Sequence, residues 1–469
     1  MNSITSTYEH KLQAAYHMIQ KRGLVVDTKK LEDLQLSVDT ELQQTLQDLS
    51  VLWQEKISIG KKKDHINIRS SKQLPALLKA KGFKIPKVPP SKDQRDAGNT
   101  DYKESVGKLP LQLLFSSTGD QAIKKLLTIA ELVTLKTRYI KARLYKTPDD
   151  LSLYLAAYNV AGTLTGRRSS NKNIFGFGGN AQNFPKHTKS AKRYLDCLVP
   201  RPGNIFLFGD QKSAEEWPVT ALCKNKTAFQ ELLNGVDRHT KLASFIFGKP
   251  ISSITKDSID RYLGKKSRHA NNYGMQAKRM SLSLAQEGFF IPEKECNILL
   301  TKVNTYDPSV QNVFHKYVQE QISKNRFLRT PFGRERYFMG FRPGASNLNV
   351  LGEAYAYIPQ SVVGDNTGLA VLYLEQHPID NSIVVQEGHD SIVQDVKYDI
   401  DTIWAALQNI EKAFDREIVF DKDFKFKIPV ETEVGFSFSR TVRLKENTKD
   451  ALIEALHTLE TKYNKDQGD

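Results

Sequence analysis

Cysteine is scarce in this sequence, and its spacing excludes a disulfide framework or a cysteine-based zinc site. Only three cysteines occur in 469 residues, Cys197, Cys223 and Cys296. They form no Cys-x-x-Cys pair, and an odd number of cysteines is typical of a reducing compartment. We therefore expect buried thiols that take no part in the chemistry.

Long apolar runs are also lacking. No run approaches the roughly 18 residues that a membrane-spanning helix needs. The first residues, MNSITSTYEHK, contain no apolar signal core. These two absences predict a soluble, intracellular protein that does not span a membrane.

Acidic residues are fewer than basic residues. The chain has 53 Asp and Glu against 68 Lys and Arg, which gives a net charge of +15 at pH 7. This balance favours an acidic partner, and nucleic acid is the commonest one. A membrane surface is the alternative partner.

The chain shows no internal repeat, and its 39% hydrophobic content is sufficient for two or three subdomains. Helical patterns cover 8–56, with a short extended piece at RGLVVD, and then 110–145 and most of 213–350. The Lys- and Pro-rich segment 60–103 is typical of a basic linker, although 70–82 has a helical pattern within it.

Strand patterns are fewer and lie in three places. The segment 153–170 predicts a strand, a turn and a second strand, and NIFLFGD (204–210) predicts a buried strand that ends on an acid. SIVVQEGHDSIVQDV (382–396) predicts a hairpin with a four-residue turn. The glycine-rich stretch 171–186 is not followed by Lys-Ser/Thr, as a phosphate-binding P-loop would be.

One helical stretch, 261–275, presents an ordered row of side chains. Arg261, Lys265, His269 and Tyr273 recur every four residues, so on a helix they form a stripe that drifts by about 40° per step. Cations suit phosphate, and flat rings suit a base or a sugar. The stripe could therefore hold a nucleoside triphosphate lengthwise. The alternative is a solvated basic helix whose tyrosine packs on the core.

Two acids occupy similar positions. Asp210 ends one apolar strand, and Asp390 lies in the turn of the apolar hairpin. If the strands pair in one sheet, both carboxylates could bind the same hard cations, as in two-metal phosphoryl transfer. The alternative is that both are ordinary turn aspartates.

Six motifs, in this order along the chain, resemble those of family A DNA polymerases, the bacterial DNA polymerase I-like group, and most of all its bacteriophage branch. They are TLTGRRSS with Arg167, NAQNFPK with Gln182 and Asn183, DQKSAE with Asp210 and Glu215, the Arg261 to Gly274 helix, AYIPQSVVGD with Gln360, and the pair His389 and Asp390. Further likenesses, INIRSSKQL and IPVETEVG, extend the resemblance over nearly the whole chain.

This resemblance implies an α+β fold of the right-hand polymerase class. The palm would be an antiparallel sheet from 150–235 and 345–469. The thumb (1–149) and the fingers (236–344) would be helical.

The resemblance also implies a template-directed DNA polymerase that adds dNMP to a primer 3′-hydroxyl and releases pyrophosphate. By this resemblance, Asp210 and Asp390 would hold two Mg²⁺ ions. Arg261 and Lys265 would bind the triphosphate, and Lys265 would also protonate the pyrophosphate. His269 and Tyr273 would lie near the sugar and base, and Glu215 would crowd a 2′-hydroxyl. The residues that would contact the primer-template are Arg167, Gln182, Asn183, Gln360 and His389.

Three positions depart from the family pattern. His269 stands where Phe or Tyr is expected, which leaves the sugar selectivity open. Ser391 replaces an acid that commonly follows the catalytic aspartate, and Trp217 stands where Arg or Lys is expected.

The implied partners are primer-template DNA and dNTPs, and the implied location is the cytoplasm of a bacterium or of a bacterial host. No room remains before the thumb for an exonuclease domain, so a separate exonuclease or replication protein chain is a further candidate partner.

Two alternative functions stay open. The first is a single-subunit RNA polymerase, in which a small residue would be expected at the position of Glu215. The second is an inactive DNA-binding subunit, which would be expected to lose a metal-binding aspartate.

Overall fold

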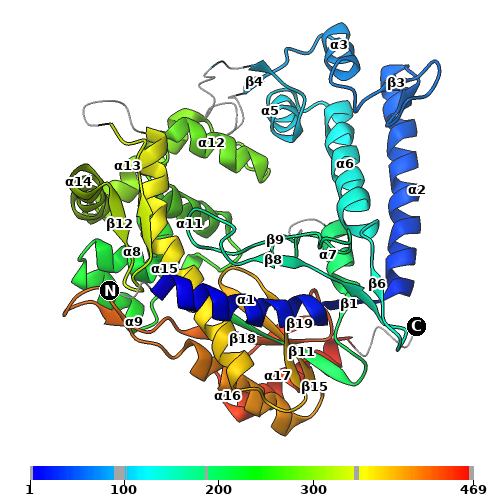
Figure 1. The fold of residues 1–469 in the computed structure, drawn as a ribbon. Helices are drawn as coiled ribbons and strands as arrows, with labels where there is room; N and C mark the ends of the chain where they lie inside the picture. The colour runs from blue at the N-terminus through cyan, green and yellow to red at the C-terminus, as the bar shows by residue number, and fades with distance from the viewer. Residues whose placement is uncertain (1–3, 89–100, 102, 185–188, 343–347, 464–469) are drawn as a thin grey trace. The chain divides into compact units, whose positions relative to one another are not determined.

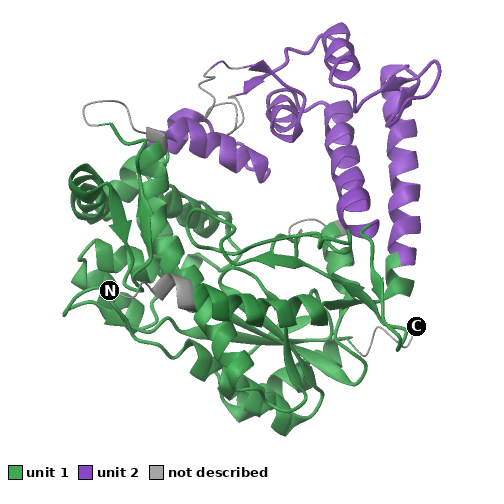
Figure 2. Ribbon diagram, viewed as in Figure 1, with its two compact units in different colours: residues 1–31, 142–275, 299–469 green, residues 32–141, 276–298 purple. Residues whose placement is uncertain are grey.

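The computed structural model describes residues 4–88, 101, 103–184, 189–342 and 348–463. These residues form two compact units (Figure 2). The first unit comprises 1–31, 142–275 and 299–469, and the second comprises 32–141 and 276–298.

Helices make up most of the chain. They are α1 (Ile4–Arg22), α2 (Thr28–Trp53), α3 (Gln73–Ala80), α5 (Lys108–Thr118), α6 (Gln121–Leu135), η1 (Lys136–Ile140), α7 (Lys189–Asp196), α8 (Glu216–Leu222), α9 (Lys226–Leu233), α10 (Arg238–Phe247), η2 (Ile251–Ser253), α11 (Ile259–Asn272), α12 (Ala277–Gln286), α13 (Glu293–Tyr306), η3 (Val310–His315), α14 (Lys316–Asn325), α15 (Leu348–Gln376), α16 (Ile400–Phe414) and α17 (Lys449–Tyr463).

The strands are mostly short. They are β1 (Leu24–Val26), β2 (Ile57–Ser58), β3 (Ile66–Asn67), β4 (Lys87–Val88), β5 (Lys103–Glu104), β6 (Tyr145–Lys146), β7 (Ser152–Tyr154), β8 (Ala157–Asn159), β9 (Ser169–Asn171), β10 (Leu198–Val199), β11 (Asn204–Gln211), β12 (Phe327–Arg329), β13 (Glu335–Tyr337), β14 (Ser382–Glu387), β15 (Ser391–Lys397), β16 (Ile418–Val419), β17 (Lys425–Phe426), β18 (Val430–Gly435) and β19 (Thr441–Arg443).

The main sheet of the first unit has the strand order β14-β15-β11-β18-β19, and every pair is antiparallel (Figure 1). Its central strand, β11, is the buried strand that NIFLFGD predicts. A Cβ on Gly209 would approach Ile410 of α16 to 2.8 Å. Successive residues of a strand face opposite sides, so Phe208 and Asp210 point away from α16.

A second antiparallel sheet in this unit has the order β10-β1-β7-β6. The expected strand, turn and strand of 153–170 are confirmed, because β8 and β9 pair antiparallel. The helix, extended piece and helix expected over 8–56 are present as α1, β1 and α2. The three cysteines are free and buried, as expected.

The second unit is built mainly from helices. In α6, Asp120 caps the N-terminus, because its side chain accepts hydrogen bonds from the backbone of Ala122 and Ile123. The helix expected within 70–82 is α3. Ser70, which precedes it, accepts hydrogen bonds from the backbone N–H groups of Lys72 and Gln73.

Trp217, unexplained by sequence, belongs to the core of the first unit. Its side chain is buried and stacks on Phe426, with ring centroids 5.4 Å apart and planes inclined by 25°. Its indole N–H donates to the carbonyl of Lys212 at 3.2 Å. The position therefore serves packing, for which a large flat side chain is suited.

In the described part of the chain, no helix is both long and apolar enough to cross a membrane.

Candidate active site

Asp210 and Asp390 come from neighbouring strands of the main sheet. Asp210, near the end of β11, pairs with Ser391, the first residue of β15. The backbone N–H of Gln211 donates to the carbonyl of Asp390 at 3.0 Å. Both aspartates line one cavity of about 530 Å³. The strand pairing that would bring the two acids together is therefore present.

Three more charged residues of the sheet, Glu431, Glu433 and Arg443, line the same cavity. Glu431 of β18 is the register partner of Asp210, and Arg443 of β19 forms ion pairs with Glu431 at 2.8 Å and with Glu433 at 2.7 Å. Because directly opposed carboxylates in a sheet repel, Arg443 offsets the charge beside Asp210. Sequence reasoning missed these residues; the alternating acids of VETEVG were the available signal.

The turn that carries His389 connects β14 and β15. Glu387 pairs with Ile392, so four residues, Gly388 to Ser391, lie between the paired residues. His389 adopts a left-handed conformation with φ of 72°. This conformation is uncommon for a residue other than glycine. It is held by two hydrogen bonds: the N–H of His389 donates to the Glu387 carboxylate at 2.9 Å, and the Thr367 hydroxyl donates to the His389 carbonyl at 2.8 Å.

Glu387 connects this turn to Gln182. The Gln182 amide donates to the Glu387 carboxylate at 3.0 Å, and the Glu387 side chain is fully buried. Burial raises the pKa of Glu387, and the charge of Arg168 opposes that shift. One buried carboxylate thus orders both the turn before Asp390 and a residue expected to contact DNA.

Arg168 is a fully buried cation that sequence reasoning also missed. Its guanidinium donates to the carbonyl of Gly364 and to the hydroxyl of Tyr8. A Cβ on Gly368 would lie 1.6 Å from Nη2 of Arg168. Gly364 and Gly368 are one turn apart on α15, so they open the space for this side chain. Their four-residue spacing was the available signal.

The stripe is helical, as expected: Arg261, Lys265 and His269 lie on α11, and Tyr273 is the residue that follows it. Ser258 caps the N-terminus of the helix by accepting from the backbone N–H of Arg261. Lys265 and His269 are exposed, whereas Arg261 and Tyr273 are half-buried. The guanidinium of Arg261 contacts Asp237 at 2.9 Å. The middle of the stripe, Lys265 and His269, therefore faces solvent.

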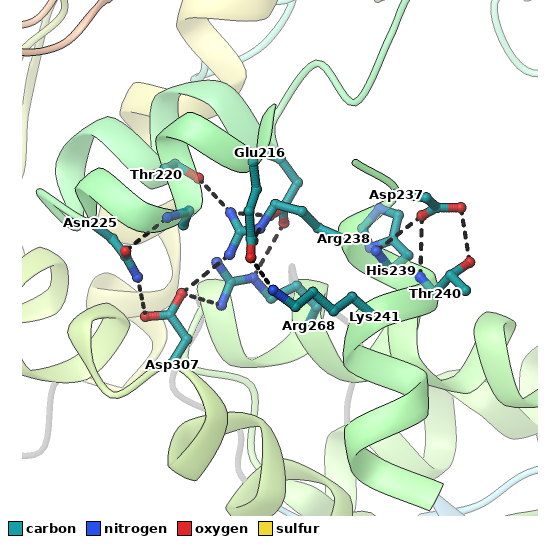
Figure 3. A network of polar contacts seen from close by, with 12 residues as sticks. Glu216, Thr220, Asn225, Asp237, Arg238, His239, Thr240, Lys241, Arg268 and Asp307 are labelled. Atoms are coloured by element: carbon teal, nitrogen blue, oxygen red, sulfur yellow. Dashed lines mark hydrogen bonds and ion pairs between the residues drawn. The ribbon is translucent and has the colours of Figure 1, made fainter. Parts of the chain in front are cut away.

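The opposite face of α11 is fixed by a buried ion network (Figure 3). Arg268 contacts Asp307 at 2.9 Å and Glu216 at 3.4 Å, and Arg238 contacts the same two acids at 3.6 and 3.5 Å. Burial alone would raise the pKa of Glu216, but Arg268 and Arg238 lower it to about 2. This network holds the rotation of α11 about its axis and so keeps the stripe outward.

The Glu215 carboxylate lies close to three other expected site residues, Arg167, His269 and Tyr273. It forms an ion pair with Arg167, accepts a hydrogen bond from the Tyr273 hydroxyl, and lies 3.7 Å from Nδ1 of His269. The rings of His269 and Tyr273 meet edge to face, with centroids 4.7 Å apart. Burial and the Glu215 charge raise the pKa of Tyr273 well above its usual value, so its hydroxyl remains a donor.

The two remaining site residues are Gln360 and Asn183. Gln360 is half-buried on α15. The next residue, Ser361, donates to the carbonyl of Thr165, and Gly364 lies against the side chain of Arg167. Asn183 follows Gln182 and is exposed.

The residues around Asp210 and Asp390 fit Mg²⁺. Magnesium ions bind oxygen and are usually held by one or two carboxylates together with substrate phosphates. The two aspartates line one cavity, and two carboxylates at one cavity meet that requirement. Among the residues that the structure describes, no cluster of three or more His, Cys, Asp or Glu is arranged to hold a metal. The two aspartates would therefore supply part of the Mg²⁺ ligands, and substrate phosphates would supply the others.

Three comparisons relate this chain to known proteins. The family model for DNA polymerase family A matches residues 31–440. A DNA polymerase of Bacillus phage SP01 is 24% identical over 93% of this chain and 51% of its own length. DNA polymerase I of Mycobacterium leprae is 24% identical over 71% of this chain and 33% of its own length. The chain thus spans about half, or less, of the length of these relatives.

The fold is similar to that of a solved structure, the POL domain of Pol1 from M. smegmatis in complex with DNA primer-template and dNTP. The TM-score is 0.74 at 21% identity, over 93% of this chain and 71% of that one. This likeness, together with the antiparallel main sheet, confirms the expected α+β class of right-hand polymerases. Since the family model covers most of the sequence, the chain belongs to DNA polymerase family A.

Proposed function

We propose that this chain is a template-directed DNA polymerase that adds dNMP to a primer 3′-hydroxyl and releases pyrophosphate. The observation that carries the proposal is the pairing of β11 and β15, which puts Asp210 and Asp390 on the wall of one cavity. Family membership supports it, as do the names of the relatives.

Asp210 and Asp390 would hold two Mg²⁺ ions, which lower the pKa of a primer hydroxyl and stabilise charge on the triphosphate and pyrophosphate. Arg261 and Lys265 bind the triphosphate along the outer face of α11. Lys265 then gives a proton to the departing pyrophosphate as a general acid. The exposure of Lys265 supports this role, because its ammonium group can reach a ligand without disrupting the core.

Glu215, His269 and Tyr273 form the end of the nucleotide site next to the sugar and base. Glu215 crowds a 2′-hydroxyl, and the contacts with Arg167 and Tyr273 hold its carboxylate in place. Arg167, Gln182, Asn183, Gln360 and His389 contact the primer-template. Minor-groove acceptors are shared by all base pairs, so donors there test pair shape without reading sequence.

Within this proposal the thumb is 1–149, the fingers are 236–344, and the palm is 150–235 with 345–469. The antiparallel main sheet supports the palm, since all five of its strands fall in those two palm ranges. A separate exonuclease or replication protein chain remains a predicted partner, which co-purification with primer extension would test.

Primer extension on a primed DNA template tests the proposal directly. With Mg²⁺ and dNTPs the primer should lengthen, and EDTA should stop the reaction. Parallel reactions with rNTPs distinguish a DNA polymerase from an RNA polymerase. Incorporation of rNTPs as efficient as that of dNTPs would contradict our assignment. Absence of extension together with intact template binding would favour the inactive DNA-binding subunit.

A further inference from the structure

A short turn in the first unit presents two large apolar side chains to solvent. It spans 173–177, with the sequence NIFGF, and follows β9. Ile174 is 93% exposed and Phe175 is 68% exposed. Single exposed apolar residues are common, but two adjacent ones at the tip of one turn suggest a contact surface.

The turn is ordered by its own hydrogen bonds. The side-chain oxygen of Asn173 accepts from the backbone N–H of Phe175 at 3.1 Å and of Phe177 at 2.9 Å. Two backbone hydrogen bonds close the turn: the N–H of Asn173 donates to the carbonyl of Phe177, and the N–H of Gly176 donates to the carbonyl of Asn173. The backbone that carries Ile174 and Phe175 is thus already in one conformation, which lowers the entropic cost of a contact made by the tip.

The base of the turn is anchored to the body of the unit. The guanidinium of Arg143 donates to the carbonyl of Phe175 at 3.1 Å and lies 4.2 Å from the centre of the Phe177 ring. A Cβ on Gly178 would lie 1.6 Å from the carbonyl oxygen of Leu155, so only glycine fits there. Anchoring at the base leaves only the tip projecting.

The charged residues in the sequence around the turn are all basic. No Asp or Glu occurs between Asp150 and Asp196, whereas that interval contains seven Lys or Arg residues. Lys172, next to the turn, is exposed. Arg167 precedes the turn and Gln182 follows it, and both belong to the set assigned above to the primer-template.

We propose that the turn 173–177 binds the minor groove of the primer-template duplex, with Ile174 and Phe175 against the bases and Lys172 near a phosphate. Apolar side chains that enter the minor groove contact or partly unstack base steps, and cations beside them neutralise the backbone. The position between Arg167 and Gln182 and the local excess of positive charge favour DNA over a protein partner. This inference rests on the proposed function, because it names a further contact with the same substrate.

The test compares full-length variants for binding to a dye-labelled primer-template, measured by fluorescence anisotropy over a range of salt. The variant I174S/F175S should raise the Kd on the order of ten-fold, because loss of base stacking costs about that much. K172A should reduce the slope of log Kd against log salt by roughly one. The matched control is I453S, because Ile453 is 44% exposed on α17, away from the turn in sequence.

A conservative variant, I174V/F175Y, should bind nearly as the unsubstituted chain does, which separates lost contact from lost folding. Unchanged affinity of I174S/F175S would overturn the inference and would leave the polymerase proposal standing. Equal weakening by I453S would overturn it as well, since the effect would then not belong to the turn. If the unsubstituted chain fails to bind primer-template, the proposed function fails and this inference fails with it.

Discussion

The Tyr273 hydroxyl donates a hydrogen bond to the Glu215 carboxylate, and these two residues are 58 positions apart in sequence. Tyr273 follows the last residue of α11, whereas Glu215 immediately precedes α8. Arg167 forms an ion pair with the same carboxylate. The carboxylate is therefore held from two sides at the end of the proposed nucleotide site, which makes its effect on the sugar testable.

Substitution of Glu215 by Ala should weaken discrimination against ribonucleotides. The carboxylate that crowds the 2′-hydroxyl is removed, and the loss of such a contact changes selectivity by roughly ten- to a hundred-fold. The measurement is kcat/KM for one dNTP and the matching rNTP in single-nucleotide extension. The exposed residue Glu417 provides the control variant, E417A. An unchanged dNTP-to-rNTP ratio in E215A would show that Glu215 does not set sugar selectivity.

Substitution of Asp390 by Asn should abolish extension and leave primer-template binding nearly intact. Asn keeps the shape of the side chain but lacks the charge needed to hold Mg²⁺. Rapid-quench extension and anisotropy binding should be measured on the same preparation. D380N, at an exposed aspartate before β14, is the control. Persistent extension by D390N would remove Asp390 from the metal site.

Substitution of Lys265 by Ala should raise the KM for dNTP and also lower kcat. A charge-assisted hydrogen bond to phosphate contributes about 1.5–3 kcal/mol, which corresponds to roughly ten-fold or more in kcat/KM. The pH profile of kcat should lose its alkaline limb if Lys265 also donates the proton to pyrophosphate. K256A changes an exposed lysine just before α11 and should have no comparable effect. A KM change with an unaltered pH profile would confine Lys265 to binding.

Substitution of Glu216 by Gln should destabilise the first unit at neutral pH, because Arg238 and Arg268 then lose a buried counter-charge. Breaking a buried ion pair costs about 3–5 kcal/mol. Urea unfolding monitored by circular dichroism at several pH values measures the change, and E417Q is the control.

The same substitution has a predictable pH dependence. The pKa of Glu216 is about 2 in the folded chain, against a reference value of 4.5. The unfolded state therefore binds more protons between these values. The stabilisation by ionised Glu216 is fully present above pH 4.5 and is lost as the pH falls toward 2. The difference between E216Q and the unsubstituted chain should shrink over that range. A difference that does not depend on pH would mean that Glu216 acts through packing alone.

Much of the fold was predictable because its signals are local. Short apolar runs identified β11 and the β14–β15 hairpin, and four-residue spacing identified the outer stripe of α11. Strong short-range patterns of this kind depend on periods of two and 3.6 residues, which are visible in any window of the chain. The hairpin turn lies at the expected place, because Glu387 pairs with Ile392 and four residues lie between them.

Sequence by itself determined the residue types, the spacing of the motifs and the positive charge, since these belong to the chain before it folds. Only the tertiary structure decided that Glu431 is the register partner of Asp210 and that Glu387 is buried beside Gln182. It also decided that Arg168 lies against Gly364 and Gly368 of α15. Arg168 and Gly364 are 196 positions apart, and no local period connects such residues. Long-range packing of helices against the sheet selects those contacts, because every buried polar group must find a partner where the fold leaves room.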